Sequence, residues 1–211
     1  MKRPAGTVSR YTPGARANHW LNAIILILLA LSGMALFHPA LFFLTGLFGG
    51  GVWARILHPW MGVVLIFTFA GLFIRFCRYN IWNKTDTQWL NRIRDVLAAR
   101  DENLPEVGRY NAGQKVVFWL MTIGIVALFL SGLVMWESQF GDVFSVESKR
   151  IAAVVHATAA VVIIGVWIIH LYAAIWVKGS VRAMTRGTVT GGWAWKHHRK
   201  WLREEAAKGN K

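Results

Sequence analysis

The sequence of 211 residues is unusually apolar and unusually basic at the same time. Hydrophobic residues make up 55% of it and charged residues 16%, whereas soluble domains are about 45–50% apolar and about 25% charged. The formal net charge is nevertheless +14, and there is one cysteine. This composition excludes disorder and a disulfide-stabilised scaffold. It also argues against nucleic-acid binding, because apolar and basic residues that are segregated in this way are typical of an integral membrane protein.

Four long segments without a charged residue predict four transmembrane helices. In chain order they are residues 17–54, 56–74, 116–136 and 151–177. A helix needs about 20 residues to cross a hydrocarbon core about 30 Å thick. The first apolar run is too long for a cleaved signal peptide and is interpreted as a retained helix. We therefore expect a single membrane domain over residues 1–211, with spans at about 18–37, 53–77, 112–137 and 149–178.

Lysines and arginines are distributed unevenly between the segments that connect these spans. All but three of the 24, the exceptions being Arg55, Lys149 and Arg150, lie in the N-terminal segment, in the connection 75–115 or beyond residue 177. The positive-inside rule therefore places both termini and this connection in the cytoplasm. Residues 179–211 are expected to form a basic cytoplasmic tail. Its aromatic and basic stretch from Trp193 to Trp201 is suited to lying on a surface of anionic lipid headgroups.

Four of the seven histidines, His19, His58, His156 and His170, fall inside or at the ends of the expected spans. Polar rings are unfavourable in hydrocarbon without partners, so such residues are candidate functional groups. His156 and His170 are 14 residues apart on one span, which places both on one helix face, about 21 Å apart along the axis. His58 matches the depth of His156, and His19 matches that of His170.

These two pairs fit two haems b, one toward each membrane surface, because one imidazole on each side of the macrocycle completes the coordination of a low-spin iron. A structural zinc ion would need four ligands, and each level offers two. The alternative is that each histidine hydrogen-bonds a neighbouring helix. The remaining histidines, His38, His197 and His198, are expected at the surface. Small residues near the four histidines suit either a flat cofactor or ordinary helix packing; they are Ser32, Gly33, Gly62, Ser131, Gly132, Ala157 and Ala160.

Several motifs together resemble the gamma subunit of respiratory formate dehydrogenase, a membrane cytochrome of the b556 type. The similarity extends from about Val8 to about Glu204, and the order and spacing of the motifs make it specific. The chain more remotely resembles the cytochrome b subunits of membrane nickel–iron hydrogenases, which share a four-helix di-haem plan. The motifs are Asn18-His19-Trp20, Arg55-Ile56-Leu57-His58-Pro59, the segment from Arg109 to Lys115, Phe118-Trp119, Trp176-Val177-Lys178-Gly179-Ser180 and the segment from Trp193 to His198.

The resemblance implies an all-α integral membrane protein of the bacterial inner membrane, a di-haem bundle of four transmembrane helices with both termini in the cytoplasm. It implies that His58 and His156 hold the periplasmic haem b, and that His19 and His170 hold the cytoplasmic haem b. Electrons would enter from an iron–sulfur beta subunit on the periplasmic side and leave to menaquinone or ubiquinone at the cytoplasmic side. Formate oxidation would take place in a separate alpha subunit that contains molybdenum or tungsten, so this chain is expected to have no catalytic residue for that step.

The same resemblance implies a quinone pocket at Asn111, Gly113, Gln114 and the neighbourhood of His170. This segment directly precedes the third expected span, where a lipid-soluble headgroup meets water. A quinone carbonyl needs a hydrogen-bond donor, and the two side-chain amides or the Gly113 N–H provide one. The alternative is a helix start, because asparagine is also a favourable N-cap residue.

Two other hypotheses remain for the function. A haem-free transporter or structural membrane protein is expected to have paired carboxylates or broken helices near mid-membrane, and none of the four uncharged segments contains an acidic residue. The other hypothesis is the same di-haem machinery serving a different membrane dehydrogenase, such as a nickel–iron hydrogenase. The identity of the co-purifying subunits and of the electron donor would distinguish the two dehydrogenases.

Overall fold

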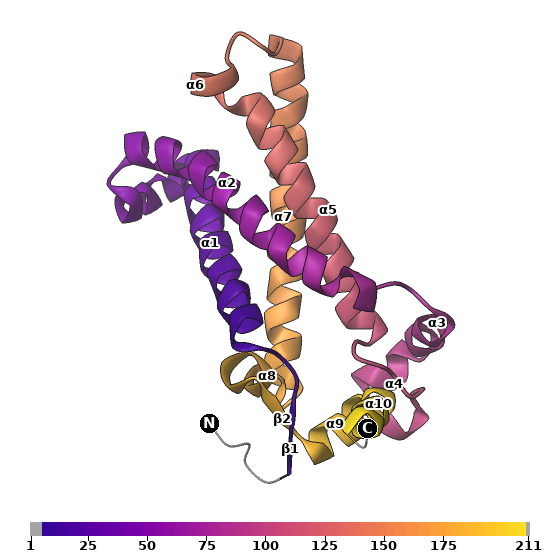
Figure 1. Ribbon diagram of the computed structural model, residues 1–211. Coiled ribbons are helices and arrows are strands. Elements are labelled where there is room, and N and C mark those ends of the chain that lie inside the picture. Colours follow the sequence, from indigo (N-terminus) through magenta and orange to yellow (C-terminus); the bar gives the residue numbers. More distant parts are fainter. Residues whose placement is uncertain (1–5, 210–211) are drawn as a thin grey trace. The chain divides into compact units, whose positions relative to one another are not determined.

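The computed structural model describes residues 6–209, and in this range four long α-helices dominate (Figure 1). Each of them is long and apolar enough to cross a membrane, and each begins and ends within a few residues of a span expected from the sequence. Thr12 caps the first of them by accepting a hydrogen bond from the Ala15 N–H at 3.3 Å. The four helices are α1 (Pro13–Phe37), α2 (Gly51–Phe76), α5 (Ala112–Met135) and α7 (Val146–Trp176).

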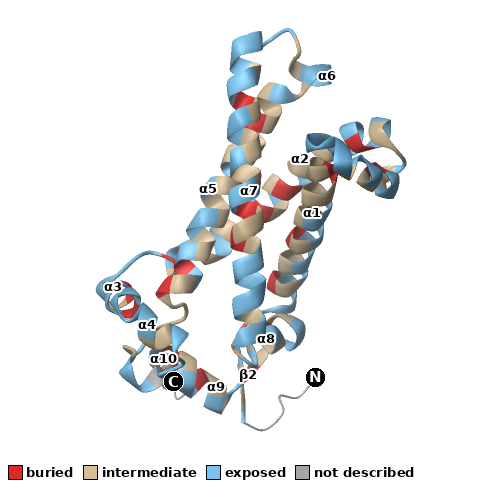
Figure 2. Ribbon diagram, turned by 180° about the vertical axis from the view of Figure 1, so that it is seen from behind, coloured by how far each residue is buried: buried red, intermediate tan, exposed pale blue. Residues whose placement is uncertain are grey.

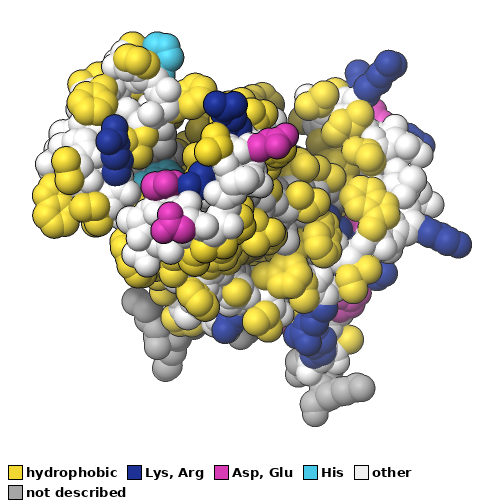
Figure 3. Space-filling model, turned by 90° about the horizontal axis from the view of Figure 1, so that it is seen from above, with side chains coloured by type: hydrophobic (Ala, Val, Ile, Leu, Met, Phe, Trp, Pro, Cys, Tyr) yellow, Lys and Arg dark blue, Asp and Glu magenta, His cyan; other side chains and the backbone are white. Residues whose placement is uncertain are grey.

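The surface of these helices is largely apolar. Figure 2 shows that few of their residues are buried, and Figure 3 shows apolar side chains over much of the face in view. Phe67 is 74% exposed and Val161 is 69% exposed. Apolar surface of this extent is unfavourable in water and is satisfied by lipid.

Contacts between residues divide the chain into two compact units. The helical unit comprises Ala17–Phe73 and Leu120–Ile169, and the basic unit comprises, among the described residues, 6–16, Ile74–Trp119 and 170–209. Only Arg55, Lys149 and Arg150 of the 24 lysines and arginines lie in the helical unit. The division thus follows the charge asymmetry of the sequence. The single membrane domain and the cytoplasmic position of the termini stay predictions.

Side chains from three helices form the core of the helical unit. Ile25 of α1, Leu65 and Phe69 of α2, and Ile125 of α5 are buried together. The fourth helix, α7, contributes Ile163, whose side chain lies where a Cβ on Gly124 of α5 would be. Glycine at this position lets two helices approach closely, as in other membrane bundles. The shorter elements of this unit are η1 (Pro39–Phe48) and α6 (Glu137–Phe140).

A small antiparallel sheet joins the two ends of the chain in the basic unit. Strand β1 (Thr7–Ser9) pairs with β2 (Thr188–Thr190), with Val8 opposite Val189. Val189 and Trp201 belong to the core beneath this sheet, and a second core lies around Trp89. The other elements of the unit are η2 (Cys77–Tyr79), α3 (Lys84–Asn91), α4 (Ile93–Leu97), η3 (Asp101–Asn103), α8 (Ser180–Arg186), α9 (Gly191–His197) and α10 (Arg199–Gly209).

The expectation of an aromatic stretch lying on a lipid surface is wrong for part of the tail. Its described residues fold into α8, β2, α9 and α10, and Trp201 is only 2% exposed because it packs against the sheet. Trp195 is 49% exposed and does point outward. The sequence also did not predict the sheet, whose strands have three residues each.

Candidate functional site

Two of the candidate histidines meet in the helical unit. His58 of α2 and His156 of α7 lie with their ring centres 6.1 Å apart and their planes at 63°. The two rings therefore lie close enough together to be ligands of one metal centre.

Both rings are held through the same nitrogen. Ser32 Oγ of α1 lies 2.8 Å from His58 Nδ1, and Ser131 Oγ of α5 lies 3.0 Å from His156 Nδ1. Since Nδ1 is engaged in each ring, Nε2 is the nitrogen that remains for a metal. Within residues 6–209, no group of three or more His, Cys, Asp or Glu side chains gathers in a way that suits a metal ion. The pair thus fits a metal that takes two protein ligands, as a bis-histidine haem does.

The other two candidate histidines fall in different units. His19 belongs to the helical unit, where its ring packs edge-on against Trp20 with the ring centres 5.5 Å apart. His170 belongs to the basic unit. The pairing of His19 with His170 therefore stays a prediction. Of the remaining histidines, His38 is exposed, as expected.

Asn111 and Gln114 form a reciprocal cap at the start of α5. The Gln114 N–H donates to Asn111 Oδ1 at 2.9 Å, and the Asn111 N–H donates to Gln114 Oε1 at 3.1 Å. Such a capping box satisfies two backbone donors at a helix N-terminus. The alternative considered for Asn111, a helix start, is therefore correct. It does not exclude quinone binding, because the cap uses the two carbonyl oxygens and not the two NH₂ groups. Gly113, between them, lies against Trp89.

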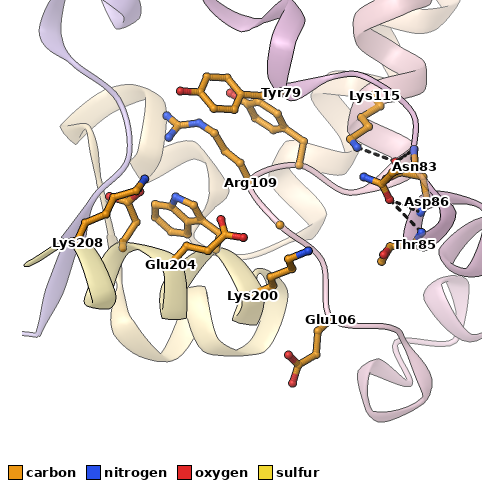
Figure 4. Close-up of a pocket in the computed structure, with 14 residues that line it drawn as sticks. Tyr79, Asn83, Thr85, Asp86, Glu106, Arg109, Lys115, Lys200, Glu204 and Lys208 are labelled. Atoms are coloured by element: carbon orange, nitrogen blue, oxygen red, sulfur yellow. Dashed lines mark hydrogen bonds and ion pairs between the residues drawn. The ribbon is translucent and has the colours of Figure 1, made fainter.

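A polar pocket of about 280 Å³ lies in the basic unit (Figure 4). Tyr110 and Lys115, which flank the capping box, line it, but Asn111, Gly113 and Gln114 do not. Lys115 Nζ lies 2.7 Å from Asp86 Oδ2, and both side chains are almost fully buried. This pair is satisfied further by the Ile81 carbonyl, which accepts from Lys115 Nζ at 2.9 Å. It ties the first turn of α5 to α3, because breaking a buried ion pair is strongly unfavourable.

The expectation that His198 is a surface residue is wrong. His198 is 1% exposed, its Nδ1 lies 2.9 Å from the Gly108 carbonyl oxygen, and its Nε2 lies 3.3 Å from Arg10 Nη2. A carbonyl oxygen only accepts, so Nδ1 carries the proton and Nε2 accepts from the guanidinium. Burial, and next the charge of Arg10, lower the pKa of His198 to about 3. The ring is neutral and connects the tail to the loop before α5.

Arg10 is the centre of this cluster, which sequence reasoning missed. It is 4% exposed, it packs over the Trp201 ring at 4.6 Å, and its Nη2 donates to the Arg109 carbonyl at 2.6 Å. Arg109 Nη2 in turn donates to the Arg10 carbonyl at 2.6 Å. Burial raises the pKa of the neighbouring Tyr110 phenol well above its usual value. Nothing local in the sequence distinguishes Arg10 from the other basic residues near the N-terminus.

The long apolar helices and the histidine pair between them define the class of protein, a membrane helix bundle, and comparisons with known proteins agree with this class. The model of the prokaryotic cytochrome b561 family matches residues 10–187. The formate dehydrogenase cytochrome b556(fdo) subunit of Escherichia coli strain K12 is 43% identical over 204 residues, which cover 97% of this chain and 95% of that protein.

Two further relatives carry similar names. The nitrate-inducible formate dehydrogenase cytochrome b556(Fdn) subunit of Escherichia coli strain K12 is 40% identical over 90% of this chain and 87% of its own length. The formate dehydrogenase cytochrome b556 subunit of Haemophilus influenzae is 35% identical over 94% of this chain and 83% of its own length.

The chain therefore belongs to the prokaryotic cytochrome b561 family and, within it, to the formate dehydrogenase cytochrome b556 subunits. This confirms the resemblance noted in the sequence. It also confirms that the chain is a multi-pass protein of the bacterial inner membrane and that its cofactor is haem b.

Proposed function

We propose that this chain is the membrane anchor of a respiratory formate dehydrogenase, carrying electrons from a periplasmic iron–sulfur subunit through two haems b to quinone at the cytoplasmic side. The names of the relatives support the assignment to formate dehydrogenase. The single structural observation that supports it most is the separation of 6.1 Å between the His58 and His156 rings. The molybdenum or tungsten centre that oxidises formate belongs, in this proposal, to a separate catalytic subunit.

His58 and His156 are the residues that hold the periplasmic haem in this proposal. When bound, haem b supplies one-electron redox chemistry. Two imidazole ligands leave the iron no open position, which suits electron transfer and not oxygen chemistry. Each histidine presents Nε2 because its Nδ1 is held by a serine. His19 and His170 hold the cytoplasmic haem in the same proposal.

The quinone site in this proposal consists of Asn111, Gly113, Gln114 and His170. Its ligand is either menaquinone or ubiquinone. The capping box fixes the two side-chain amides by their carbonyl oxygens. Their NH₂ groups are then the donors that a quinone carbonyl would meet. Gln114 is exposed and Asn111 is partly exposed, so both side chains are open to a ligand.

The electron donor tests the assignment to formate dehydrogenase. The complex would be solubilised in mild detergent and purified through a tag on this chain, and its subunits would be identified by mass spectrometry. We expect an iron–sulfur subunit and a molybdenum- or tungsten-containing subunit. We also expect that formate, and not hydrogen gas, reduces the haem absorption bands. Reduction by hydrogen and not by formate, with a nickel-containing subunit present, would instead favour the hydrogenase alternative.

A further inference from the structure

We propose that Ser32-Gly33 and Ser131-Gly132 are two equivalent positioning sites, which orient His58 and His156 and lower the midpoint potential of the haem between them. This inference rests on the proposed haem ligation by these two histidines. It assigns a role to four small residues. From the sequence alone, these residues could either contact a cofactor or serve ordinary helix packing.

The direction of each hydrogen bond follows from the proposed ligation through Nε2. Ser32 Oγ lies 2.8 Å from the Leu28 carbonyl oxygen, and Ser131 Oγ lies 2.6 Å from the Ala127 carbonyl oxygen. When Nε2 of each histidine binds the iron, as proposed, the ring proton is on Nδ1, and Nδ1–H donates to the serine oxygen. The serine hydroxyl has one proton, which it then donates to the carbonyl of its own helix. Both rings are thereby held by a hydrogen bond in the tautomer that ligation through Nε2 requires.

Burial makes these two bonds effective. Ser32 is 0% exposed and Ser131 is 6% exposed, so water does not compete for the serine oxygens. A hydrogen bond is stronger in surroundings of low dielectric constant, and a hydroxyl that already donates is a better acceptor. At each of the two rings, the hydrogen bonds from histidine to serine and from serine to carbonyl thus polarise one another.

The glycine that follows each serine provides the space for the ring. A Cβ on Gly33 would lie 3.3 Å from His58 Cε1, and a Cβ on Gly132 would lie 3.4 Å from His156 Cε1. The contact at Gly33 would be tighter than most contacts of a real Cβ, and the contact at Gly132 would be at the limit of ordinary van der Waals contact. A side chain at Gly33 would therefore require the His58 ring to shift by a few tenths of an ångström, and at Gly132 the ring leaves room for little more than a Cβ.

The arrangement occurs twice with nearly the same spacing. His58 follows Ser32 by 26 residues and His156 follows Ser131 by 25 residues, in each case from one long helix to the next. In both cases the serine bonds the carbonyl four residues before it and Gly is the next residue. Ordinary packing would not require the same two residues, with the same two roles, beside each histidine.

The effect on the haem has a defined sign. Donation from Nδ1–H makes an imidazole a more basic ligand, and a more basic ligand stabilises ferric over ferrous iron, which lowers the midpoint potential. Removing one serine hydroxyl should therefore raise it. The hydrogen bond is present in both oxidation states, so only the difference between its strengths in the two states shifts the potential. The whole of one ordinary hydrogen bond, about a five-fold change in the ferric-to-ferrous ratio, is therefore the upper bound. This bound is about 40 mV, since a tenfold change is 59 mV for one electron.

The test is a redox titration, followed by absorption and electron paramagnetic resonance, of the detergent-purified holo-complex. Ser32→Ala and Ser131→Ala should each raise the midpoint potential of the periplasmic haem, and the double variant should raise it about twice as far. The second haem of the same molecule is the internal control and should keep its potential. Ser32→Thr and Ser131→Thr, which keep the hydroxyl, should restore the value of the unmodified protein.

The outcomes separate this inference from the proposed ligation. If His58→Ala leaves both haems in place, the proposed ligand assignment fails. If His58→Ala removes one haem but the double serine variant keeps that haem at an unchanged potential, only the present inference fails. Loss of that haem from the alanine variants, with retention in the threonine variants, supports positioning by the hydroxyl. Its loss from the alanine and threonine variants alike, at unchanged helix content, would overturn the inference in favour of packing.

Gly33 has a matched control on its own helix. Gly33→Ala should displace the His58 ring and change the low-spin resonance signal of the periplasmic haem. Gly14→Ala makes the same substitution in α1, where an added Cβ would meet no atom within 4 Å, and should leave that signal unchanged. Equal spectra for Gly33→Ala and the unmodified protein would contradict the role of glycine as space for the ring.

Discussion

At the scale of single residues, two polar networks of the chain use histidine in the same way. His58, His156 and His198 each place Nδ1 against an oxygen atom, a serine hydroxyl in the first two cases and the Gly108 carbonyl in the third. The remaining nitrogen then has a defined task. For His198 it accepts from Arg10, so the ring must stay neutral for the network to persist.

Acidification should therefore destabilise the basic unit. The pKa of His198 is lowered from 6.5 to about 3 in the folded chain, so the unfolded chain binds more protons between these values. Stability is then complete above about pH 6.5 and decreases as the pH falls toward 3. Between pH 6.5 and pH 5 the loss is about 2 kcal/mol, at about 1.36 kcal/mol per pH unit.

Hydrogen–deuterium exchange measures this loss. Exchange in the segment 188–209 should be faster at pH 5 than at pH 7, after correction for the intrinsic rate. In His198→Ala the exchange should be fast at both pH values, because the network is already broken. An unmodified chain whose corrected exchange does not change between pH 7 and pH 5 would contradict the neutral-ring account.

At the scale of elements, the long helices were predictable from the sequence and the small sheet was not. An uncharged apolar run of sufficient length has one favourable structure in a membrane, which is a helix. The strands β1 and β2 have three residues each and pair residues as far apart as Thr7 and Thr190. Local sequence patterns do not reveal a pairing between residues so far apart in the chain. The burial of His198 has the same origin, since its partners Arg10 and Gly108 are 188 and 90 residues away in sequence.

The start of α5 allows the capping role and the quinone role to be separated. Asn111→Asp and Gln114→Glu keep the oxygen atoms that accept in the capping box, and remove the NH₂ donors. We expect both variants to fold and to keep their haems. Quinone should bind more weakly, by about five-fold for the loss of one hydrogen bond. The measurement is stopped-flow reoxidation of formate-reduced haem at limiting concentrations of a quinone analogue.

A control for these variants is available in the same unit. Asn83 caps α3 in a similar box with Asp86, so Asn83→Asp makes the same change at another helix start. The haem of the Asn83→Asp variant should be reoxidised at the same rate as that of the unmodified protein. If Asn111→Asp and Gln114→Glu also reoxidise at that rate, these residues are caps only and the quinone site lies elsewhere.

At the scale of the whole molecule, charge and contacts divide the chain at nearly the same places. The helical unit holds three of the 24 lysines and arginines, and the uncharged segments supply most of its residues. Such a distribution predicts that the basic unit faces the cytoplasm. The division into an apolar and a basic part was therefore predictable from the sequence. The long-range packing inside the basic unit was not, and only the structure shows it.

The orientation has a direct test. A reporter that is active only in the cytoplasm, fused after Lys211, should be active, and one that is active only in the periplasm should be inactive. A reporter inserted in the loop 141–145, between α6 and α7, should give the opposite result. Periplasmic activity of the fusion after Lys211 would reverse the orientation and exchange the positions of the two proposed haems.

The central claim is that two pairs of histidines hold two haems, and selective loss of the haems tests it most directly. Reduced-minus-oxidised spectra of the purified complex would be recorded for His58→Ala, His156→Ala, His19→Ala and His170→Ala, with His38→Ala as the exposed control. We predict that the first two variants lose one spectral component, that the next two lose the other, and that the control keeps both. Loss of the same component in His58→Ala and His19→Ala would contradict the account.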